Sequence, residues 1–574
     1  MTDQPTAVAP QHPDDLLDRA RRWAAEDPDA ETRAELEALT DAAARDGDAA
    51  EAARADLADR FSGTLEFGTA GLRGALGAGP MRMNRVVVTR AAAGLAAYLR
   101  DTGSAPGSSV VIGYDARRNS DVFARDTAEV MTGAGFRALV LPEPLPTPVL
   151  AFAIRHLGAV AGVMVTASHN PPQDNGYKVY LGDGSQIVPP ADAGIAERIA
   201  AVGPLADVPR GDAGERLDDS VVGAYVDAVA SLLDPAGPRE VVSVYTPLHG
   251  VGGAIQRRVL EATGFTRPHA VDEQAEPDPD FPTVAFPNPE EPGAMDLALA
   301  LAEQQRADLI VAHDPDADRC AVGVPTPDSP HPWRMLRGDE LGALLGDHLA
   351  RSGREGVYAA SIVSSSLLGR IAADAGQPYE QTLTGFKWIG RVPGLAFGYE
   401  EALGYCVAPH VAADKDGISA GLLVLDLAAR LKADGLTLLD RLDEIARRHG
   451  LHATDQLSVR VSDLSLIGAA MARLRATPPD ALGGLAVERV DDLTRPSDGL
   501  PPTDGLRFAL ADGARVVVRP SGTEPKLKCY LEVVVAVEAD VEDGVEAARI
   551  SAAGRLDAIR GDLAGSLGLE TLTP

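Results

Sequence analysis

One stretch of the chain reads Gly162-Val163-Met164-Val165-Thr166-Ala167-Ser168-His169-Asn170-Pro171-Pro172. Its first four residues are apolar, which predicts a short buried strand. The Asn-Pro pair favours a turn, so Ser168 is expected in a loop at the carboxyl end of that strand. A serine there is a usable nucleophile if a base takes its proton. The alternative is an ordinary serine/threonine turn.

The same texture continues along most of the chain. From Leu65 onwards, short apolar runs alternate with helical stretches, and the rhythm restarts near Val241, Leu309 and Val357. This alternation predicts an α/β fold with parallel sheets and crossover helices. After a Pro-, Asp- and Gly-rich region at 477–505, two strand-like runs and a last helix predict a smaller α+β domain at the C-terminus. Residues 1–14 are expected to be a tail, and 15–60 a helical extension interrupted at Asp27-Pro28.

The composition excludes several classes of partner. The formal net charge is −31, from 53 basic and 84 acidic residues, whereas nucleic-acid-binding domains present a basic face. The same field repels anionic lipid, and no apolar run reaches the roughly 18 residues of a membrane span. Three scattered cysteines and the lack of a basic and apolar leader segment favour a reducing, cytoplasmic location.

A second loop carries three carboxylates. Asp314, Asp316 and Asp318 follow the apolar run at 309–311, and at this spacing they can surround one hard cation. A calcium-binding EF-hand loop is excluded, because its required Gly and Glu positions are Arg319 and Pro325 here. The remaining alternative is a solvated acidic turn, although carboxylates about 4 Å apart repel each other by roughly 4 kcal/mol per pair at an effective dielectric of 20.

Four further loops complete the set of candidate sites. Residues 519–526 combine Arg, Gly and hydroxyl side chains that suit an anion, and 398–404 hold two carboxylates between glycines that suit sugar hydroxyls. Residues 68–74 and 414–417 each supply one cation, Arg73 and Lys415. Each loop alone has a structural alternative. Together they supply the parts for metal-assisted phosphoryl transfer to a sugar.

With these motifs in view, the chain resembles the α-D-phosphohexomutase superfamily, which contains the phosphoglucomutases and phosphomannomutases. Residues 166–171, 314–319 and 519–525 follow the family's motif order between about Leu65 and Glu532. Residues 65–74 and 384–388 are similar to the branch that also contains phosphopentomutases. The resemblance implies three related α/β domains with mixed or parallel sheets and a smaller α+β domain around a central cleft. The expected segments are 1–60 (tail and helical extension), 61–215 (phosphoserine loop), 216–325 (metal loop), 326–455 (sugar loop) and 456–574 (phosphate loop).

The resemblance also implies residue roles. Ser168 would carry the phosphoryl group and complete a Mg²⁺ site with Asp314, Asp316 and Asp318. Lys178, with His169 near it, matches a proposed general acid/base. Arg73 and Arg319 would stabilise the transferring group. The sugar-binding residues would be Glu400, Thr384 and Gly385. The residues that hold the non-reacting phosphate would be Lys415, Arg519, Ser521, Gly522 and Thr523.

The implied reaction interconverts hexose 1-phosphate and hexose 6-phosphate, with glucose as the first choice, through a sugar 1,6-bisphosphate. Many glucose-specific relatives read Gly-Glu-Glu-Ser where this chain has Tyr399-Glu400-Glu401-Ala402. Phosphomannomutase and phosphopentomutase activities therefore stay open. A metal-dependent sugar phosphatase and a non-catalytic sugar-phosphate sensor are more distant alternatives. The expected partner is a small phosphosugar, and the chain is expected to be a monomer or small homo-oligomer.

Overall fold

The structure is a computed structural model that describes residues 13–68, 71–326, 332–461, 465–495, 499–521, 526–538 and 543–568. The chain divides into two units, one made of residues 1–232, 242–320 and 410–418 and the other of 233–241, 321–409 and 419–574. Within the described stretches, no helix combines the length and the apolar character needed to cross a membrane. Most of the expected tail, residues 1–12, lies outside the described part.

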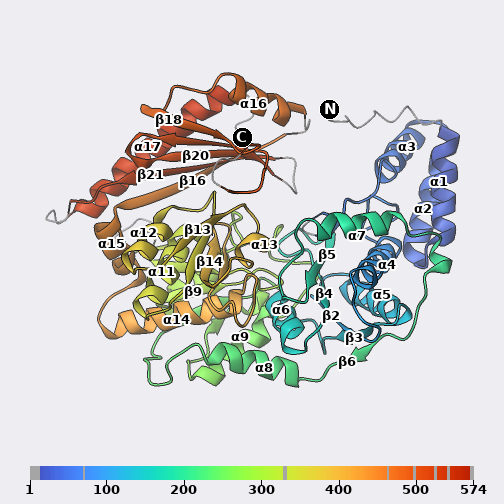
Figure 1. Cartoon of the computed structure of the whole chain (residues 1–574), viewed down its shortest axis with the longest axis horizontal. Coiled ribbons are helices and arrows are strands. Elements are labelled where there is room, and N and C mark those ends of the chain that lie inside the picture. Colours follow the sequence, from blue (N-terminus) through green and yellow to red (C-terminus); the bar gives the residue numbers. More distant parts are fainter. Residues whose placement is uncertain are drawn as a thin grey trace. The chain divides into compact units, whose positions relative to one another are not determined.

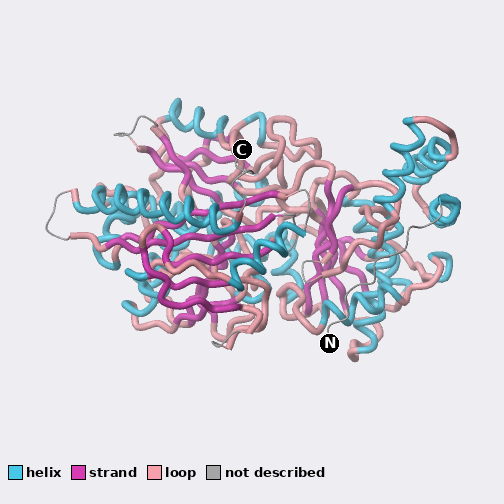
Figure 2. Tube along the Cα trace, turned by 90° about the horizontal axis from the view of Figure 1, so that it is seen from above, coloured by secondary structure: helices cyan, strands magenta, loops and turns pink. Residues whose placement is uncertain are grey.

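Three helices form the N-terminal part of the first unit: α1 (Pro13–Glu26), α2 (Ala30–Ala43) and α3 (Asp48–Arg60). The first break falls at the predicted Asp27-Pro28 position, where the Asp29 side chain caps α2. A second break, which the sequence did not predict, contains Gly47 at φ 100°. Leu36, Leu57 and Phe61 are buried in the core of this group. Figures 1 and 2 show the three helices beside the first α/β domain.

The first α/β domain is a six-stranded mixed sheet in the order β1-β5-β4-β2-β3-β6. Its strands are β1 (Leu72–Ala75), β2 (Ser109–Tyr114), β3 (Arg137–Val140), β4 (Ala161–Val165), β5 (Asp174–Leu181) and β6 (Glu215–Arg216). Its helices are α4 (Arg85–Asp101), α5 (Ser120–Gly133), α6 (Thr147–His156), α7 (Ala191–Ala200) and the short 3₁₀ helix η1 (Leu205–Asp207). Helix α6 lies against one face of the sheet, and α4 and α5 lie on the other (Figure 1).

Two features of this sheet differ from the sequence prediction. Strand β5 was not predicted, because its buried residues include the polar Asn175 and Lys178, which interrupt the apolar pattern. The expected domain boundary between 215 and 216 falls inside β6, which pairs with β3. The first sheet therefore extends to Arg216.

The second α/β domain contributes three parallel strands to the first unit: β7 (Ser243–Thr246), β8 (His269–Ala270) and β9 (Leu309–Ala312). Its helices are α8 (Ser220–Ala230), α9 (Gly252–Thr263), η2 (Asp272–Gln274) and α10 (Asp296–Gln305). Thr246 pairs with Ala312 at the carboxyl ends of β7 and β9. The loops that follow these two strands consequently leave the sheet at the same edge, where ligands bind in α/β folds.

The second unit contains the antiparallel hairpin of β10 (Ala321–Pro325) and β11 (Trp333–Met335). A mixed sheet follows in the order β13-β12-β14-β15, with β12 (Val357–Ser361), β13 (Tyr379–Thr382), β14 (Leu395–Glu400) and β15 (Gly404–Cys406). The helices of this part are α11 (Gly338–Arg351), α12 (Leu367–Asp374), α13 (Phe386–Ile389), α14 (Gly417–Ala433) and α15 (Leu438–His449).

The C-terminal domain is an antiparallel sheet in the order β16-β21-β20-β19-β18-β17. The strands are β16 (Leu451–Arg460), β17 (Ala481–Leu482), β18 (Leu485–Asp492), β19 (Leu506–Leu510), β20 (Arg515–Pro520) and β21 (Lys526–Val535). The helices are α16 (Ser465–Ala476), η3 (Ala511–Gly513) and α17 (Gly544–Leu567). The expected boundary between 455 and 456 is wrong, because it cuts β16, which pairs with β21 along its whole length.

The α/β class and the smaller α+β C-terminal domain are confirmed.

Candidate active site

Ser168 lies in the loop between β4 and β5 and is 3% exposed. Its backbone has φ 51°, in the left-handed region, where a residue other than Gly pays about 1–3 kcal/mol of strain that the surroundings must offset. The Ser168 N–H donates to Thr166 Oγ1 at 2.9 Å, and the Asn170 N–H donates to the Ala167 carbonyl at 3.0 Å. The strained turn thus has local hydrogen bonds that hold it.

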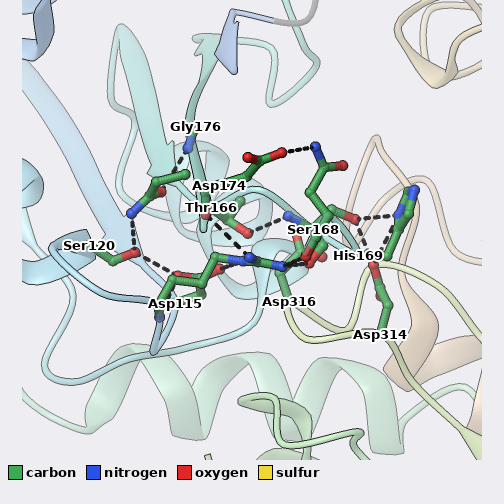
Figure 3. A network of polar contacts seen from close by, with 12 residues as sticks. Asp115, Ser120, Thr166, Ser168, His169, Asp174, Gly176, Asp314 and Asp316 are labelled. Carbon is green, nitrogen blue, oxygen red and sulfur yellow. Dashed lines mark hydrogen bonds and ion pairs between the residues drawn. The ribbon is translucent and has the colours of Figure 1, made fainter. Parts of the chain in front are cut away.

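The Ser168 hydroxyl points at the acidic turn of the second α/β domain. Ser168 Oγ donates to Asp314 Oδ2 at 2.6 Å and lies 3.2 Å from His169 Nδ1. Figure 3 shows Ser168, His169 and Asp314 joined in this way. Two loops that were predicted separately, 146 residues apart, are therefore in direct contact.

The acidic turn is buried. Asp314, Asp316 and Asp318 are each at most 1% exposed, and one carboxylate oxygen from each lies within 4.8 Å of the others. Backbone packing encloses the turn, because a Cβ atom at Gly250 would lie 2.3 Å from Pro315 Cα. Buried carboxylates at this spacing require compensating positive charge, so the alternative of a solvated acidic turn is wrong.

Lysine side chains supply part of that charge. Lys178, on β5, has Nζ 2.7 Å from Asp316 Oδ2 and 2.8 Å from Asp318 Oδ2. Lys415 Nζ lies 3.0 Å from Asp318 Oδ2. Lys415 was predicted to hold the non-reacting phosphate, and its contact with the acidic turn was not anticipated.

The carboxylates have different pKa values. Burial, together with repulsion from Asp316 and Asp318, raises the pKa of Asp314 well above its ordinary value. Burial also acts on Asp316 and Asp318, but it is outweighed and their pKa values are lowered. Lys178 acts on both carboxylates, with the Thr147 hydrogen bond at Asp316 and with Lys415 and Arg319 at Asp318. Two carboxylates therefore stay ionised at neutral pH, and added positive charge would relieve the repulsion felt by the third.

The carboxylate oxygens that remain suit a hard cation. Among the described residues, Asp316 Oδ1 and Asp318 Oδ1 are buried and have no hydrogen-bond partner. Unsatisfied buried carboxylate oxygens are costly, and clustered carboxylate oxygens are the ligands that Mg²⁺ prefers. The donor set therefore fits a divalent cation.

The predicted arginines and His169 lie around this turn. Arg73, on β1, donates from Nη1 to Asn170 Oδ1 at 3.1 Å. Arg319 Nε lies 4.0 Å from Asp314 Oδ2. Burial and the nearby Arg319 and Arg73 charges hold the pKa of His169 well below its ordinary value, so its imidazole is neutral at physiological pH.

The predicted sugar-loop residues belong to the second unit. Thr384 precedes Gly385, whose N–H donates to Glu400 Oε1 at 2.8 Å. The neighbouring Glu401 accepts hydrogen bonds at Oε2 from Ser361 Oγ at 3.2 Å and Ser364 Oγ at 3.0 Å. Of the two adjacent carboxylates, Glu401 is thus engaged with the sheet, while Glu400 contacts the predicted loop 384–385.

The predicted phosphate loop is only partly described. Arg519 lies near the end of β20, and the Ser521 N–H donates to the Lys526 carbonyl at 2.8 Å. Gly522 and Thr523 lie outside the described residues.

Two side chains that sequence reasoning missed contact the site. Thr147, at the start of α6, donates from Oγ1 to Asp316 Oδ2 at 2.6 Å, and its N–H donates to the Asp316 carbonyl at 2.9 Å. Arg117 donates to the Ser168 carbonyl at 2.6 Å. Neither residue stands in a motif with a chemical signature. Arg117 lies between β2 and α5, and Thr147 is the first residue of α6, which follows β3. A search for polar residues between each strand and the helix after it would have included both.

Comparison with known proteins places the chain in a family. The phosphoglucomutase/phosphomannomutase models match along the chain: α/β/α domain I at residues 64–204, domain II at 223–326, domain III at 337–448 and the C-terminal domain at 457–549. A Haemophilus influenzae protein named "Probable phosphomannomutase" is 51% identical over 79% of this chain and 93% of its own length. The human phosphopentomutase is 36% identical over 84% of this chain and 87% of its own length.

A solved structure agrees with these relatives. The crystal structure of a Thermus thermophilus protein described as a phosphomannomutase superposes with a TM-score of 0.67 and 28% identity, over 86% of this chain and 99% of that one. The chain therefore belongs to the phosphoglucomutase/phosphomannomutase family and is an intramolecular phosphotransferase.

Proposed function

We propose that the chain interconverts hexose 1-phosphate and hexose 6-phosphate, with glucose as the first sugar, through a phosphorylated Ser168 and a hexose 1,6-bisphosphate. The observation that carries this proposal is the 2.6 Å contact between Ser168 Oγ and Asp314 Oδ2. A buried hydroxyl in a strained turn beside a candidate metal site is the arrangement that nucleophilic phosphoryl transfer needs.

The proposed reaction has two half-reactions. In the first, the bond between phosphorus and Ser168 Oγ breaks and a bond to the free sugar hydroxyl oxygen forms. The hydroxyl proton leaves through a base, and Ser168 Oγ ends protonated. The second half-reaction is the reverse of the first at the other phosphate of the bisphosphate. The bond between that phosphorus and the sugar oxygen breaks, and a bond from the phosphorus to Ser168 Oγ forms. No water is consumed and no phosphate is released, which is what separates a mutase from a phosphatase.

His169 and Lys178 are the candidates for proton transfer. The neutral His169 imidazole has Nδ1 3.2 Å from Ser168 Oγ and is able to accept a proton. Burial lowers the pKa of Lys178, but Asp316 and Asp318 outweigh burial and raise it above its ordinary value. We therefore assign His169 the role of general base. We assign Lys178 the role of general acid, and its ammonium group also supplies positive charge near the transferring phosphoryl group.

We assign the metal site to Asp314, Asp316 and Asp318, with Ser168 as the fourth protein ligand and Mg²⁺ as the ion. When bound, Mg²⁺ supplies positive charge that stabilises the oxygens of the transferring phosphoryl group. Arg73 and Arg319 would add to that charge. In the second unit, we assign sugar binding to Glu400, Thr384 and Gly385, and phosphate binding to Arg519, Ser521, Gly522 and Thr523. In the first unit, we assign phosphate binding to Lys415.

The test is a mutase assay on wild type and Ser168→Ala, with glucose 1-phosphate, Mg²⁺ and catalytic glucose 1,6-bisphosphate. We expect wild type to form glucose 6-phosphate without accumulating free phosphate, and intact mass to show one phosphoryl group on the protein. Ser168→Ala should fold, lose turnover and stay unmodified. Near-normal turnover of Ser168→Ala would reject the nucleophile, and stoichiometric release of phosphate by wild type would identify a phosphatase.

A different sugar is the second candidate. The similarity to the human phosphopentomutase and the alanine at position 402 support a smaller or less hydroxyl-dependent sugar site, and the Haemophilus influenzae relative supports mannose. Measuring kcat/KM for glucose, mannose and ribose 1-phosphates under one set of conditions separates these activities.

A further inference from the structure

One arginine outside the predicted site holds the backbone of the serine-bearing loop. Arg117 follows β2, and its side chain is 1% exposed. Its Nη2 donates to the carbonyl oxygens of Ser168 at 2.6 Å and Asn170 at 2.5 Å. Its Nη1 donates to the carbonyl oxygens of Pro171 at 2.9 Å and Asp174 at 3.2 Å. One guanidinium therefore donates hydrogen bonds to four backbone carbonyl groups between Ser168 and Asp174.

The charge of Arg117 is balanced from within its own domain. Arg117 Nε lies 3.4 Å from Asp115 Oδ2. Asp115 Oδ1 accepts from the Arg117 N–H at 3.0 Å and from Ser120 Oγ at 2.7 Å, and Figure 3 shows the contact between Asp115 and Ser120. A buried arginine needs a paired charge and partners for its donors. Here Asp115 pairs the charge and the four carbonyls use the two Nη atoms, while Nε has no hydrogen-bond partner among the described residues. Arg117 is thus committed to the loop and is enclosed away from solvent.

The other side of the guanidinium meets the second α/β domain. The Phe281 ring, 2% exposed, has its centroid 4.9 Å from Arg117 Cζ, within the range of a cation–π contact. Phe281 also lies edge-on to the His249 ring, at 6.5 Å between centroids. Two residues further on, the Val251 N–H donates to the Pro315 carbonyl inside the acidic turn at 2.8 Å. A continuous set of contacts thus links Arg117 to the candidate metal loop.

We propose that Arg117 is a positioning residue for phosphoryl transfer: it holds the Ser168 loop in its strained conformation and, through Phe281, keeps the nucleophile in register with the acidic turn. This inference rests on the proposed mutase function. It assigns Arg117 no contact with substrate, because its guanidinium is enclosed by the loop, Asp115 and Phe281.

Loss of the Arg117 guanidinium would remove hydrogen-bond donors from the serine loop. Without it, four carbonyl groups of the loop lose a donor, and the left-handed Ser168 backbone loses one of the contacts that offset its strain. A lysine in its place offers its donors from a single nitrogen and has no planar fork, so it cannot reach all four carbonyls with good geometry. A displacement of about 1 Å at a reacting group costs about 100-fold in rate.

The experiment compares Arg117→Lys, the double variant Arg117→Met with Asp115→Asn, and Phe281→Leu. The double variant removes the buried cation and its partner charge together, and Phe281→Leu keeps an apolar side chain but removes the ring face. The matched control is Arg118→Ala, because the neighbouring Arg118 is 59% exposed and pairs with Asp280 at the surface, where ion pairs contribute little. The measurements are thermal unfolding, kcat and KM for glucose 1-phosphate, and the rate at which glucose 1,6-bisphosphate phosphorylates Ser168, followed by intact mass.

For Arg117→Lys we expect kcat and the rate of Ser168 phosphorylation to fall together by about 100-fold, with KM changed by less than about twofold. The double variant should be at least as slow, Phe281→Leu should show a parallel loss of about tenfold, and Arg118→Ala should match wild type. A purely structural role predicts instead that activity falls only in proportion to the folded fraction. That result overturns the inference, as does a rise in KM alone or a wild-type phosphorylation rate in Phe281→Leu.

These outcomes are separable from failure of the proposed function. If wild type itself never takes a phosphoryl group from the bisphosphate, the mutase proposal fails. If wild type is phosphorylated and the folded Arg117 and Phe281 variants are phosphorylated equally fast, only the positioning role fails.

Discussion

Lys178 Nζ lies 2.7 Å from Asp316 Oδ2, and this contact joins β5 of the first α/β domain to the acidic turn of the second. The same Asp316 oxygen accepts from Thr147 Oγ1 at 2.6 Å. One carboxylate oxygen is therefore shared by two elements of the first domain, while the other oxygen of Asp316 has no hydrogen-bond partner among the described residues. Asp316 Oδ2 thus connects the two domains, and Asp316 Oδ1 is left to bind a cation.

Replacing Lys178 by Met should leave Asp316 and Asp318 buried without their main counter-charge. Breaking a buried ion pair on one side costs about 3–5 kcal/mol, so the variant should unfold at a lower temperature than wild type. Because Mg²⁺ would then be the main source of positive charge, it should raise the unfolding midpoint more in Lys178→Met than in wild type. Equal Mg²⁺ effects on the two proteins would contradict the assignment of the ion to this turn.

Replacing Ser168 by Gly or by Ala should separate the loss of turnover from the effect of backbone strain on stability. Both variants should lack turnover, since neither has a nucleophile. Ala at φ 51° keeps the strain, whereas Gly adopts this conformation freely; Ser168→Gly should therefore be more stable than Ser168→Ala by about 0.5–1 kcal/mol. Chemical denaturation of the two variants measures the difference. A more stable Ser168→Ala would mean that the left-handed backbone at this position carries no strain.

Replacing Asp316 by Asn should weaken Mg²⁺ binding while keeping the shape of the turn. The amide offers one neutral oxygen in place of a carboxylate, and hard cations lose affinity as ligand charge falls. Isothermal titration with Mg²⁺ should show at least about tenfold weaker binding, and activity should need correspondingly more Mg²⁺. Asp280→Asn is the control, because Asp280 is an exposed carboxylate that pairs with Arg118. An unchanged titration of Asp316→Asn would remove the metal assignment.

Glu401 should make the free energy of unfolding depend on pH, between the pKa of this carboxyl in the unfolded chain and its pKa in the folded chain. Burial, with repulsion from Glu400 and Asp339, raises the pKa of Glu401 from 4.5 to about 7. The folded state therefore favours the protonated carboxyl, so this contribution is complete below about pH 4.5 and is lost as pH rises through about 7. The loss amounts to at most about 3 kcal/mol.

Glu401→Gln should remove this dependence, because an amide does not titrate and keeps an acceptor for Ser361 and Ser364. The difference in unfolding free energy between variant and wild type, measured from about pH 3.5 to about pH 8 (about one unit on either side of the window), should move in favour of the variant as pH rises. A constant difference across this range would show that folding does not raise the pKa of Glu401.

Much of the fold could be predicted from the sequence, because short apolar runs indicate where the buried strands lie. The apolar runs at 162–165 and 309–311 correspond to β4 and β9. Strand β5 was missed because Asn175 and Lys178 are buried in it, and their partners come from distant loops that no local pattern records. The boundaries at 215/216 and 455/456 were misplaced for a related reason: β6 and β16 belong to their sheets through pairing with β3 and β21, and pairing is not a local property.

Ser168 and the aspartates at 314–318 could be identified from their residue type and their position after a strand. A serine hydroxyl is a possible nucleophile and clustered carboxylates are possible metal ligands, whatever the rest of the fold. Their meeting at 2.6 Å depended on how the first two α/β domains pack, as did the ammonium of Lys178 between Asp316 and Asp318 and the guanidinium of Arg117 behind the serine loop. Electrostatic balance in a buried site is set by distances across the chain. An arginine that looks like any surface residue in the sequence thus becomes, once folded, the donor that four backbone carbonyls share.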